Sequence, residues 1–541
     1  MVTEPGRSRL TNGRPDRRTV AAWAAHAGAD VDPAQLRARL AAGSLPAAFE
    51  EAARESGDRP ALTIEGESLT HRELDDAAAR VAGWLAGRGV GPGDRVLLSG
   101  PNSLHFAVSY LAVLRAGAVA TPAGAALTEA ELRHLIADSG ATAAVAGGEA
   151  LERLRRLTDE GALGFTVSLD GELPADAQPL PVPQLDPTRP AMLAYTSGTT
   201  GRPKGALLRH ANLLASLRGI MLAWRFGPED VLVHSLPLTH QHGLSGLQAA
   251  LLSGARAVIH AAFDPARLCG EVAAQRATVL FAVPTVYERL LGWQGAAGAD
   301  LSSLRLATSG SAPLPPTLFE RVQDLLGKPP LERYGTTETG LDISNPYDGP
   351  RRPGSVGLPL PGVEIAIVDP DGRELEDGAD GELLLRGPQV FGGYWRDGTE
   401  APDDFLPGGW FRTGDLARID PEDGFVSITG RLKELIISGG LNVYPREVES
   451  ALEEHRAVRR AAVVGLPSAR WGEEVVAFVV PREGEDFDPD DVRAHARGLL
   501  APYKCPKAVF VTRELPVNAL GKLQRFRLVE LGERLRREEE S

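Results

Sequence analysis

The stretch Tyr195–Gly205 reads YTSGTTGRPKG, and it decides the fold class of the chain. Glycines lack a Cβ and let backbone N–H groups converge on one anion, while hydroxyls and the Lys204 ammonium add further donors. The stretch therefore predicts a loop that holds phosphate oxygens. It is not a Walker loop, because Pro203 and Gly205 flank the lysine and oppose an immediate helix. The competing interpretation is an ordinary flexible surface turn.

The composition indicates a globular protein with more than one domain. The chain has 541 residues, 43% of them hydrophobic and 24% charged, and is too long for one core. Its formal net charge of −14 argues against general binding of nucleic acid or of an anionic membrane. Cys269 and Cys505 lie far apart and predict neither disulfides nor a metal site, which suits the cytoplasm. No apolar run approaches a membrane span, and the arginine-rich start does not read as a signal peptide.

Lysine is scarce, with six lysines among the 58 basic residues. A retained lysine is therefore a mild indication of a site that needs a compact ammonium rather than a planar guanidinium. Lys204, Lys433 and Lys522 each lie in a glycine-containing segment. These three are the candidates for such sites.

The pattern of apolar residues predicts three regions. Alternating strand and helix patterns up to about residue 325 predict α/β layers with mostly parallel sheets. From Gly354 onward, apolar and polar residues alternate between Asp-Gly turns, which indicates an antiparallel or barrel-like section. After Gly430 a separate α+β domain of about a hundred residues is expected.

Four further segments carry residues that suit nucleotide chemistry. Glu338 ends the run RYGTTE and could bind Mg²⁺, and Asp415 follows a tight turn and could accept hydrogen bonds from a ribose. The Gly-Gly loop at 438–442 follows the basic pair Arg431 and Lys433, which suits a hinge beside a channel. A turn presents Lys522. Each segment also has a simple structural explanation, namely a capped loop, an Asx turn, a linker and a solvated side chain.

Three histidines, His234, His240 and His242, lie within nine residues of one another. No convincing further zinc ligand is nearby, so we assign His240 to a pocket wall and His242 to a structural role. The chain contains no Gly-x-Ser-x-Gly motif, which disfavours a serine hydrolase.

In their order and spacing these segments resemble the adenylate-forming superfamily of acyl-CoA synthetases, adenylation domains and luciferases, over residues 45–530. The resemblance implies an AMP-forming acid–thiol ligase. An acid attacks the α-phosphate of ATP to give an acyl-adenylate and pyrophosphate, and a thiol, usually of coenzyme A, then displaces AMP. ATP, Mg²⁺ and coenzyme A as co-substrate are implied.

The resemblance also implies the domain organisation. An N-terminal tail at 1–44 would precede a large α/β domain with a barrel-like section at 45–432. A small mobile α+β domain at 433–541 would pivot at Lys433 and alternate between two positions. The protein would be a cytoplasmic monomer or homodimer with no nucleic-acid or membrane partner.

The same resemblance implies roles for individual residues. Lys522, Thr337, Glu338 and His240 would be catalytic, with Glu338 as the Mg²⁺ ligand. The nucleotide would contact Thr196, Ser197, Gly198, Thr199, Thr200, Lys204, Gly310, Ser311, Ala312, Tyr334, Gly335, Thr337, Asp415 and Arg431. The acyl pocket would contain His240, Gln241, Arg305, Ser309 and Thr336, and the coenzyme A tunnel Ser438, Gly439, Gly440 and Asn442.

Within the superfamily, runs such as Val356–Gly362 are most similar to malonyl-CoA synthetases. The acyl pocket departs from that group at Gln241, Ala262 and Thr336, where small, basic and methionine side chains are typical. Arg305 remains as a partner for a second carboxylate, which would be costly to bury without a cation. We therefore expect a small polar acid of malonate-like character.

Three alternatives stay open. The first is a diazotase or nitrosating enzyme of a natural-product pathway that activates nitrite on the same scaffold. The second is an acyl-AMP ligase that loads a carrier protein in trans. The third is a non-catalytic binding protein, which the intact stretch 196–204 and residues Glu338, Asp415 and Lys522 disfavour.

Overall fold

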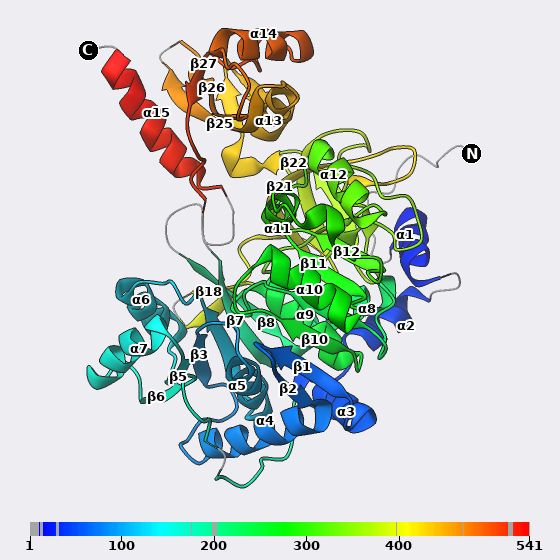
Figure 1. Cartoon of the computed structure of the whole chain (residues 1–541), viewed down its shortest axis with the longest axis vertical. Coiled ribbons are helices and arrows are strands. Elements are labelled where there is room, and N and C mark those ends of the chain that lie inside the picture. The colour runs from blue at the N-terminus through cyan, green and yellow to red at the C-terminus, as the bar shows by residue number, and fades with distance from the viewer. Residues whose placement is uncertain are drawn as a thin grey trace. The chain divides into compact units, whose positions relative to one another are not determined.

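The structure, a computed structural model, describes residues 10, 15–28, 32–174, 176–196, 203–396, 398–468, 470–517 and 523–539 (Figure 1). The chain divides into two compact units. The first unit contains residues 1–366 and 384–412, and the second contains residues 367–383 and 413–541. No helix in these described ranges is long and apolar enough to cross a membrane.

Two large sheets form the first unit, and the central pairs of both are parallel. The nine-stranded sheet has the order β15 (Leu358–Pro359), β14 (Ile343–Ser344), β13 (Leu331–Tyr334), β12 (Leu306–Ser309), β11 (Val279–Ala282), β9 (Val231–His234), β10 (Arg256–Ile259), β1 (Pro60–Ile64) and β2 (Glu67–Thr70). The eight-stranded sheet has the order β19 (Thr399–Ala401), β18 (Tyr394–Arg396), β8 (Lys204–Arg209), β7 (Pro190–Thr196), β4 (Val119–Ala123), β3 (Arg95–Ser99), β5 (Ala143–Ala146) and β6 (Phe165–Ser168).

Helices connect these strands, and sequence signals set several of their ends. At the start of α4, the Thr70 hydroxyl accepts from Glu73 N–H and the Glu73 carboxylate accepts from Thr70 N–H at 2.8 Å, which is a capping box. At the end of α6, Gly140 takes the left-handed conformation that favours glycine. The connecting helices are α3 (Leu45–Ser56), α4 (His71–Ala86), α5 (Leu104–Arg115), α6 (Glu129–Ser139), α7 (Glu149–Asp159), α8 (His210–Ala223), α9 (Gln241–Leu252), α10 (Pro265–Gln275), α11 (Pro284–Leu291), η1 (Ala296–Gly298) and α12 (Pro316–Leu326).

The nine-stranded sheet provides the edge that carries most of the predicted site. Strand β11 is buried at every residue, as expected for a parallel strand covered on both faces. Strands β9, β11, β12 and β13 run parallel, so their carboxyl ends meet at one edge. In open α/β sheets ligands bind beyond this edge. His234, Ser309 and Tyr334 are the last residues of three of these strands.

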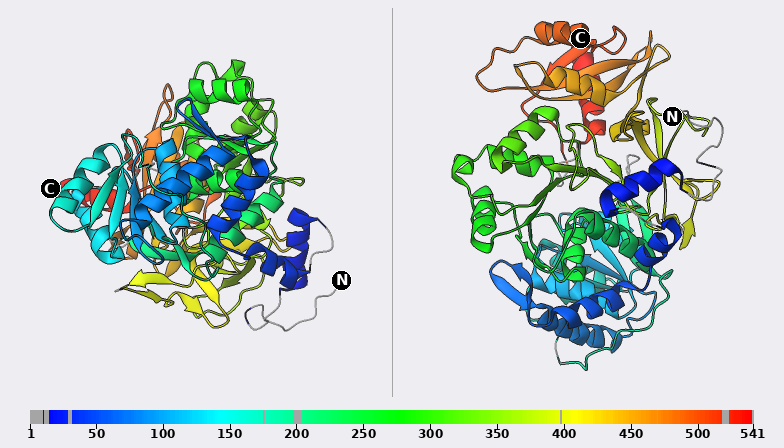
Figure 2. Two further views of the ribbon diagram at one scale, coloured as in Figure 1. Left: turned by 90° about the horizontal axis from the view of Figure 1, so that it is seen from below. Right: turned by 90° about the vertical axis from the view of Figure 1, so that its right-hand side faces the viewer.

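Two helices form within residues 1–44, which the sequence predicted as an N-terminal tail. Helices α1 (Arg17–Ala27) and α2 (Pro33–Leu40) are seen in dark blue on the surface of the first unit (Figure 2). Trp23 is fully buried, and its indole N–H donates to Val363 O at 2.8 Å. The signal that sequence reasoning missed is Asp32, which caps α2 directly before a proline.

A third sheet has the order β16 (Glu364–Val368), β17 (Gly381–Arg386), β21 (Trp410–Ile419) and β20 (Phe405–Leu406), with β22 (Val426–Arg431) on β21. Its β20–β21 and β21–β22 pairs are antiparallel, as the alternating pattern predicted.

The part of the second unit that follows β22 is an α+β layer. Its sheet has the order β24 (Leu441–Val443), β23 (Ile436–Ser438), β26 (Gly472–Pro481) and β25 (Val458–Ser468), with β27 (Ala508–Val511) parallel to β26. Val448 and Leu452, at helical spacing in α13, pack on β25 and β26 in the core of this layer. Its helices are η2 (Leu432–Glu434), α13 (Pro445–Glu453), α14 (Pro489–Leu499) and α15 (Arg525–Glu539). The predicted hinge residue Lys433 lies in η2.

Candidate active site

One tyrosine contacts both the phosphate-loop lysine and the predicted Mg²⁺ ligand. The Tyr394 hydroxyl donates a hydrogen bond of 2.6 Å to Glu338 Oε1. Lys204 Nζ lies 4.6 Å from the centre of the Tyr394 ring, within the range of a cation–π contact. Strand β18 pairs with β8 through Tyr394 and Ala206, so sheet pairing brings residue 394 beside the strand that begins at Lys204.

A network of side-chain hydrogen bonds stabilises the loop that carries Thr337 and Glu338. Thr336 Oγ1 lies 3.0 Å from Thr339 Oγ1, and Thr339 in turn donates to Asp342. Gln389 Nε2 donates to the other oxygen of Asp342 at 3.1 Å. Burial raises the pKa of Asp342 to about 7. Thr336 is therefore part of the loop's internal support.

The residues around Glu338 fit a magnesium ion that arrives with a nucleotide. Mg²⁺ usually keeps several waters and takes one or two protein carboxylates together with substrate phosphates. Glu338 is 9% exposed and supplies one carboxylate, whose Oε1 already accepts from Tyr394. Among the described residues, no group of three or more metal-ligating side chains is present. The donor set therefore suits a shared site and not a closed protein cage.

The loop after β12 has the backbone strain that is typical of a ligand site. Ser311 has φ 68°, which is uncommon for a residue with a side chain and costs about 1–3 kcal/mol. His242 Nδ1 lies 3.1 Å from Ser311 Oγ. At Gly310 an added Cβ would lie 2.4 Å from Arg333 Cζ, so a larger residue here would displace the Arg333 guanidinium. Ala312 follows in the same loop, and Gly335 on the neighbouring loop is equally restricted by Gly340 O.

Several buried polar atoms near this loop have no hydrogen-bond partner among the described residues. Arg333 is 6% exposed, and its Nε and Nη2 are both unpartnered. Three further buried atoms also have no hydrogen-bond partner among the described residues, namely Gln241 Oε1, His242 Nε2 and Ser309 Oγ. Burial lowers the pKa of Arg333 to about 9, and burial together with Arg333 holds the pKa of His242 well below its usual range. Buried polar groups normally find partners, so these atoms mark a place for a polar ligand.

The sequence pattern predicted no role for Arg333, although this residue begins the run RYGTTE. The available signal was the pair of charged residues, Glu332 and Arg333, between apolar neighbours directly before a glycine-containing loop. His240, predicted as a pocket wall, immediately precedes α9 and Gln241 begins it. Burial lowers the pKa of His240, so its imidazole is neutral near pH 7.

Arg305, which the sequence predicted as an acyl-pocket residue, is not brought together with these residues. It precedes β12 and so lies at the opposite end of that strand from Ser309. Its guanidinium donates to both carboxylate oxygens of Asp230, at 2.7 and 2.6 Å. Its third nitrogen donates to Trp224 O at 2.8 Å. Arg305 thus links the amino end of β12 to Asp230, which directly precedes β9.

The two predicted ribose residues lie together in the second unit. Arg431 Nε is 3.0 Å from Asp415 Oδ1, and the two residues face each other across β21 and β22. Asp415 is buried, and its N–H donates to Thr413 Oγ1 at 3.0 Å. A buried carboxylate held in this way is positioned to accept hydroxyl hydrogen bonds.

The predicted thiol-tunnel loop forms a tight hairpin between β23 and β24. Gly439 and Gly440 have φ values of 61° and 78°, as a two-residue hairpin turn requires. Ser438 is buried in this hairpin, while Asn442 is exposed.

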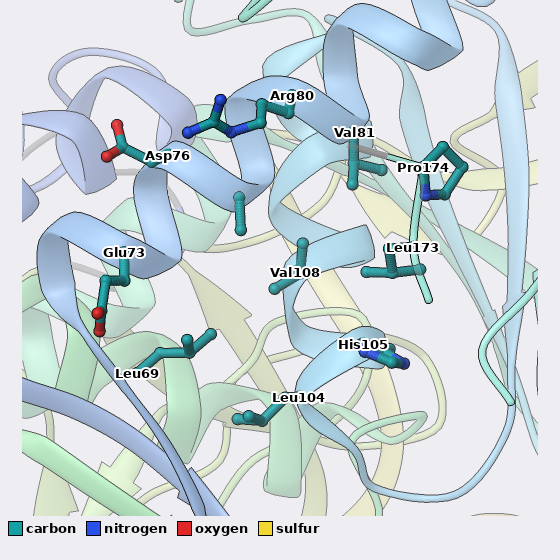
Figure 3. Close-up of a pocket in the computed structure, with 11 residues that line it drawn as sticks. Leu69, Glu73, Asp76, Arg80, Val81, Leu104, His105, Val108, Leu173 and Pro174 are labelled. Atoms are coloured by element: carbon teal, nitrogen blue, oxygen red, sulfur yellow. The ribbon is translucent and has the colours of Figure 1, made fainter. Parts of the chain in front are cut away.

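Five predicted residues, Ser197, Gly198, Thr199, Thr200 and Lys522, lie outside the described residues. A cavity of about 390 Å³ between α4 and α5 is shown in Figure 3. Leu69, Glu73, Val81 and Val108 are among its lining residues, and none of the predicted site residues lines it. This cavity is therefore separate from the candidate site.

Comparison with known proteins agrees with this geometry. The family model "AMP-binding enzyme" matches residues 49–395, and "AMP-binding enzyme C-terminal domain" matches residues 447–522. A feruloyl-CoA synthase from Amycolatopsis sp is 38% identical over 476 residues, covering 87% of this chain and 95% of the relative. A mitochondrial malonate–CoA ligase from Mus musculus is 36% identical over 517 residues, covering 87% and 88%. ATP-bound MatB from Rhodopseudomonas palustris has a TM-score of 0.86 and 38% identity, covering 90% of this chain and 99% of that structure.

The chain belongs to the AMP-binding enzyme family of adenylate-forming ligases. This confirms the predicted resemblance, the mixed α/β class with a large N-terminal and a small C-terminal domain, and the AMP-forming ligase class. It also confirms the predicted cofactors, ATP, Mg²⁺ and coenzyme A as co-substrate. The roles of individual residues stay predictions.

Proposed function

We propose that the protein is an acid–CoA ligase for a small dicarboxylic acid of the malonate type. The observation that carries this proposal is the buried guanidinium of Arg333. Its Nε and Nη2 have no partner among the described residues. These two nitrogens form one edge of the guanidinium, the edge that binds a carboxylate with two parallel hydrogen bonds.

Energetics favour a negatively charged group opposite Arg333. A buried charge that lacks hydrogen-bond partners costs several kcal/mol, and burial has lowered the pKa of this guanidinium to about 9 even though the Asp342 carboxyl is nearby. An acid with a second carboxylate would remove this cost when it binds. A long-chain fatty acid would increase it, because its tail brings no acceptor. The unpartnered Gln241 and His242 atoms likewise favour a polar substrate.

The proposed reaction distributes the remaining roles along the chain. Lys204 and the phosphate loop would bind the departing pyrophosphate, and Glu338 would hold Mg²⁺, which neutralises phosphate charge when bound. Asp415 and Arg431 would fix the ribose. Lys522 would bridge the substrate carboxylate and the α-phosphate, where charge develops during attack. The hairpin at 438–442 would then line the path of the coenzyme A thiol.

The substrate can be tested by ATP–pyrophosphate exchange with malonate, methylmalonate, acetate, butyrate, octanoate, ferulate and nitrite. We expect the fastest exchange with malonate or methylmalonate. Arg333→Met should reduce exchange with these two by roughly 10²-fold, as expected for loss of a buried charge pair, and should spare acetate or butyrate. The matched control is Arg305→Met, which should leave the ratio of dicarboxylate to monocarboxylate rates unchanged.

Other outcomes would contradict the proposal. If exchange is fastest with ferulate or octanoate, the substrate is that acid and not a dicarboxylate. AMP release only with nitrite and an aryl amine would favour a diazotase. Transfer of the acyl group to a pantetheine-bearing carrier protein and not to free coenzyme A would favour an acyl-AMP ligase. The coenzyme A acceptor is supported by relatives that are named CoA ligases.

A further inference from the structure

We propose that Tyr394 is a positioning residue, which holds Glu338 and Lys204 apart and in place for ATP with its Mg²⁺. The inference rests on the use of ATP and Mg²⁺ in the proposed function and is independent of the identity of the acid. Tyr394 comes from β18, about 190 positions after Lys204 in the sequence, and no sequence motif pointed to it.

The Tyr394 hydroxyl orients the predicted Mg²⁺ ligand. Tyr394 Oη donates to Glu338 Oε1 at 2.6 Å, and Tyr394 is the one donor to this carboxylate found among the described side chains. A tyrosine hydroxyl carries a proton that it can donate, and a carboxylate oxygen can only accept it. The bond orients the carboxylate and occupies one of its two oxygens. Such a bond from a neighbouring side chain is how proteins commonly orient a metal ligand.

The face of the Tyr394 ring contacts the Lys204 ammonium. Lys204 Nζ lies 4.6 Å from its centre, where the negative face of an aromatic ring attracts a cation. The anion is therefore held at the end of Tyr394 and the cation on its face. Both charged groups therefore contact the same side chain, one at its hydroxyl and the other at its ring. The ring acts as a spacer, which keeps the ammonium available for phosphate and the carboxylate available for Mg²⁺.

Neighbouring residues hold both the side chain and the backbone of Tyr394 in place. Phe391 packs edge-on against it with ring centres 5.0 Å apart, and Phe391 N–H donates to Glu338 O at 3.0 Å. Strand pairing with Ala206 fixes its backbone. Before it, Gly393 leaves no room for a side chain, because a Cβ would lie 2.4 Å from Ala401 O. The tyrosine is thus held on several sides and can impose its geometry on both partners.

Two variants separate the two contacts. Tyr394→Phe removes the hydroxyl and keeps the ring face, and Tyr394→Leu removes both. ATP binding is measured by calorimetry, first in EDTA and then across a titration with Mg²⁺. For Tyr394→Phe we expect unchanged affinity in EDTA and a roughly tenfold smaller enhancement by Mg²⁺, the size of a lost hydrogen bond to a charged group. For Tyr394→Leu we expect a further loss of about two- to fivefold in EDTA.

The matched control is Tyr110→Phe. Tyr110 is fully buried, and its hydroxyl is bonded to Gln248 and not to any predicted site residue. This variant should bind ATP like the wild type under both conditions. The inference is overturned if Tyr394→Phe shows a normal Mg²⁺ titration, or if both Phe variants lose affinity equally in EDTA. A wild type that binds ATP with normal Mg²⁺ dependence but rejects dicarboxylates would instead defeat only the proposed acid.

Discussion

Arg525 Nε lies 2.8 Å from Glu434 Oε2, so the first residue of α15 is bonded to the residue that follows the predicted hinge at Lys433. The same guanidinium also pairs with the buried carboxylate of Glu449 and donates to Val463 O at 2.8 Å. One arginine therefore ties together η2, α13, β25 and α15 within the second unit.

Removing this arginine should be strongly destabilising. Arg525→Met would leave the buried Glu449 with only the longer contact of 3.8 Å to Arg446, and loss of its main ion partner should cost about 3 kcal/mol. Glu434→Gln should cost only about 1 kcal/mol, because its carboxylate is partly exposed and the bond to Glu449 remains. Urea unfolding of the two variants measures the difference. Equal losses of unfolding free energy in the two variants would show that the Arg525–Glu449 ion pair does not contribute more than the Arg525–Glu434 pair.

Gly310→Ala should impair recognition of the acid more than that of ATP. The new Cβ would lie 2.4 Å from Arg333 Cζ and Nε and would push the guanidinium away, and such overpacking costs about 1–3 kcal/mol. The KM for a dicarboxylate in pyrophosphate exchange should rise roughly tenfold, while exchange with a monocarboxylate changes less. Gly270→Ala, in α10 with open space around it, is the control.

Lys522→Ala should separate the two half-reactions. Adenylation should fall by roughly 10²-fold or more, because a cation is lost where charge develops on the α-phosphate. Thioester formation from supplied acyl-adenylate and coenzyme A should be largely kept. The two steps are followed as pyrophosphate exchange and acyl-CoA formation. Equal loss in both would remove Lys522 from its proposed role.

Because of His26, the free energy of unfolding should decrease as the pH is lowered from 6.5 towards 4. It is buried, and burial lowers its pKa from 6.5 to about 4 despite a contact of 3.2 Å with Leu358 O. The unfolded state therefore takes up a proton first as the pH falls. The stabilisation is complete above pH 6.5 and is lost towards pH 4, with about 2 kcal/mol gone at pH 5.

Comparing urea unfolding at pH 7.5 and pH 5 tests this dependence. His26→Gln keeps a donor for Leu358 O and should lose about 2 kcal/mol less than the wild type between these pH values. Burial also lowers the pKa of His210 to about 4, so part of the slope remains in this variant. Identical slopes in the two proteins would contradict the assignment to His26.

Local patterns in the sequence were enough to predict the α/β layers and the contiguous site segments. The Asp415–Arg431 pair could be anticipated because both residues lie in recognisable motifs, and the structure places them 3.0 Å apart. Tyr394 could not, because only pairing of β18 with β8 brings it to Lys204. Arg333 was overlooked because its importance depends on what surrounds it, namely burial and the absence of hydrogen-bond partners among the described residues.

Arg305 shows the limit of reading a site from sequence distance. It lies only four positions before Ser309, yet a strand separates them, and the two residues lie at opposite ends of it. Distance along a strand grows by about 3.3 Å per residue, so a few positions decide which edge of the sheet a side chain occupies.

The two N-terminal helices have a practical consequence for anyone who shortens this protein. The family match begins at residue 49, which invites truncation there. Such a cut would remove Trp23, Leu36 and Leu40 and expose the apolar surface around Ala215 that they cover. It would also strip Glu364 of its contact with Arg37. A protein trimmed to the family boundary should therefore aggregate, whereas one that starts before Asp16 keeps this surface covered.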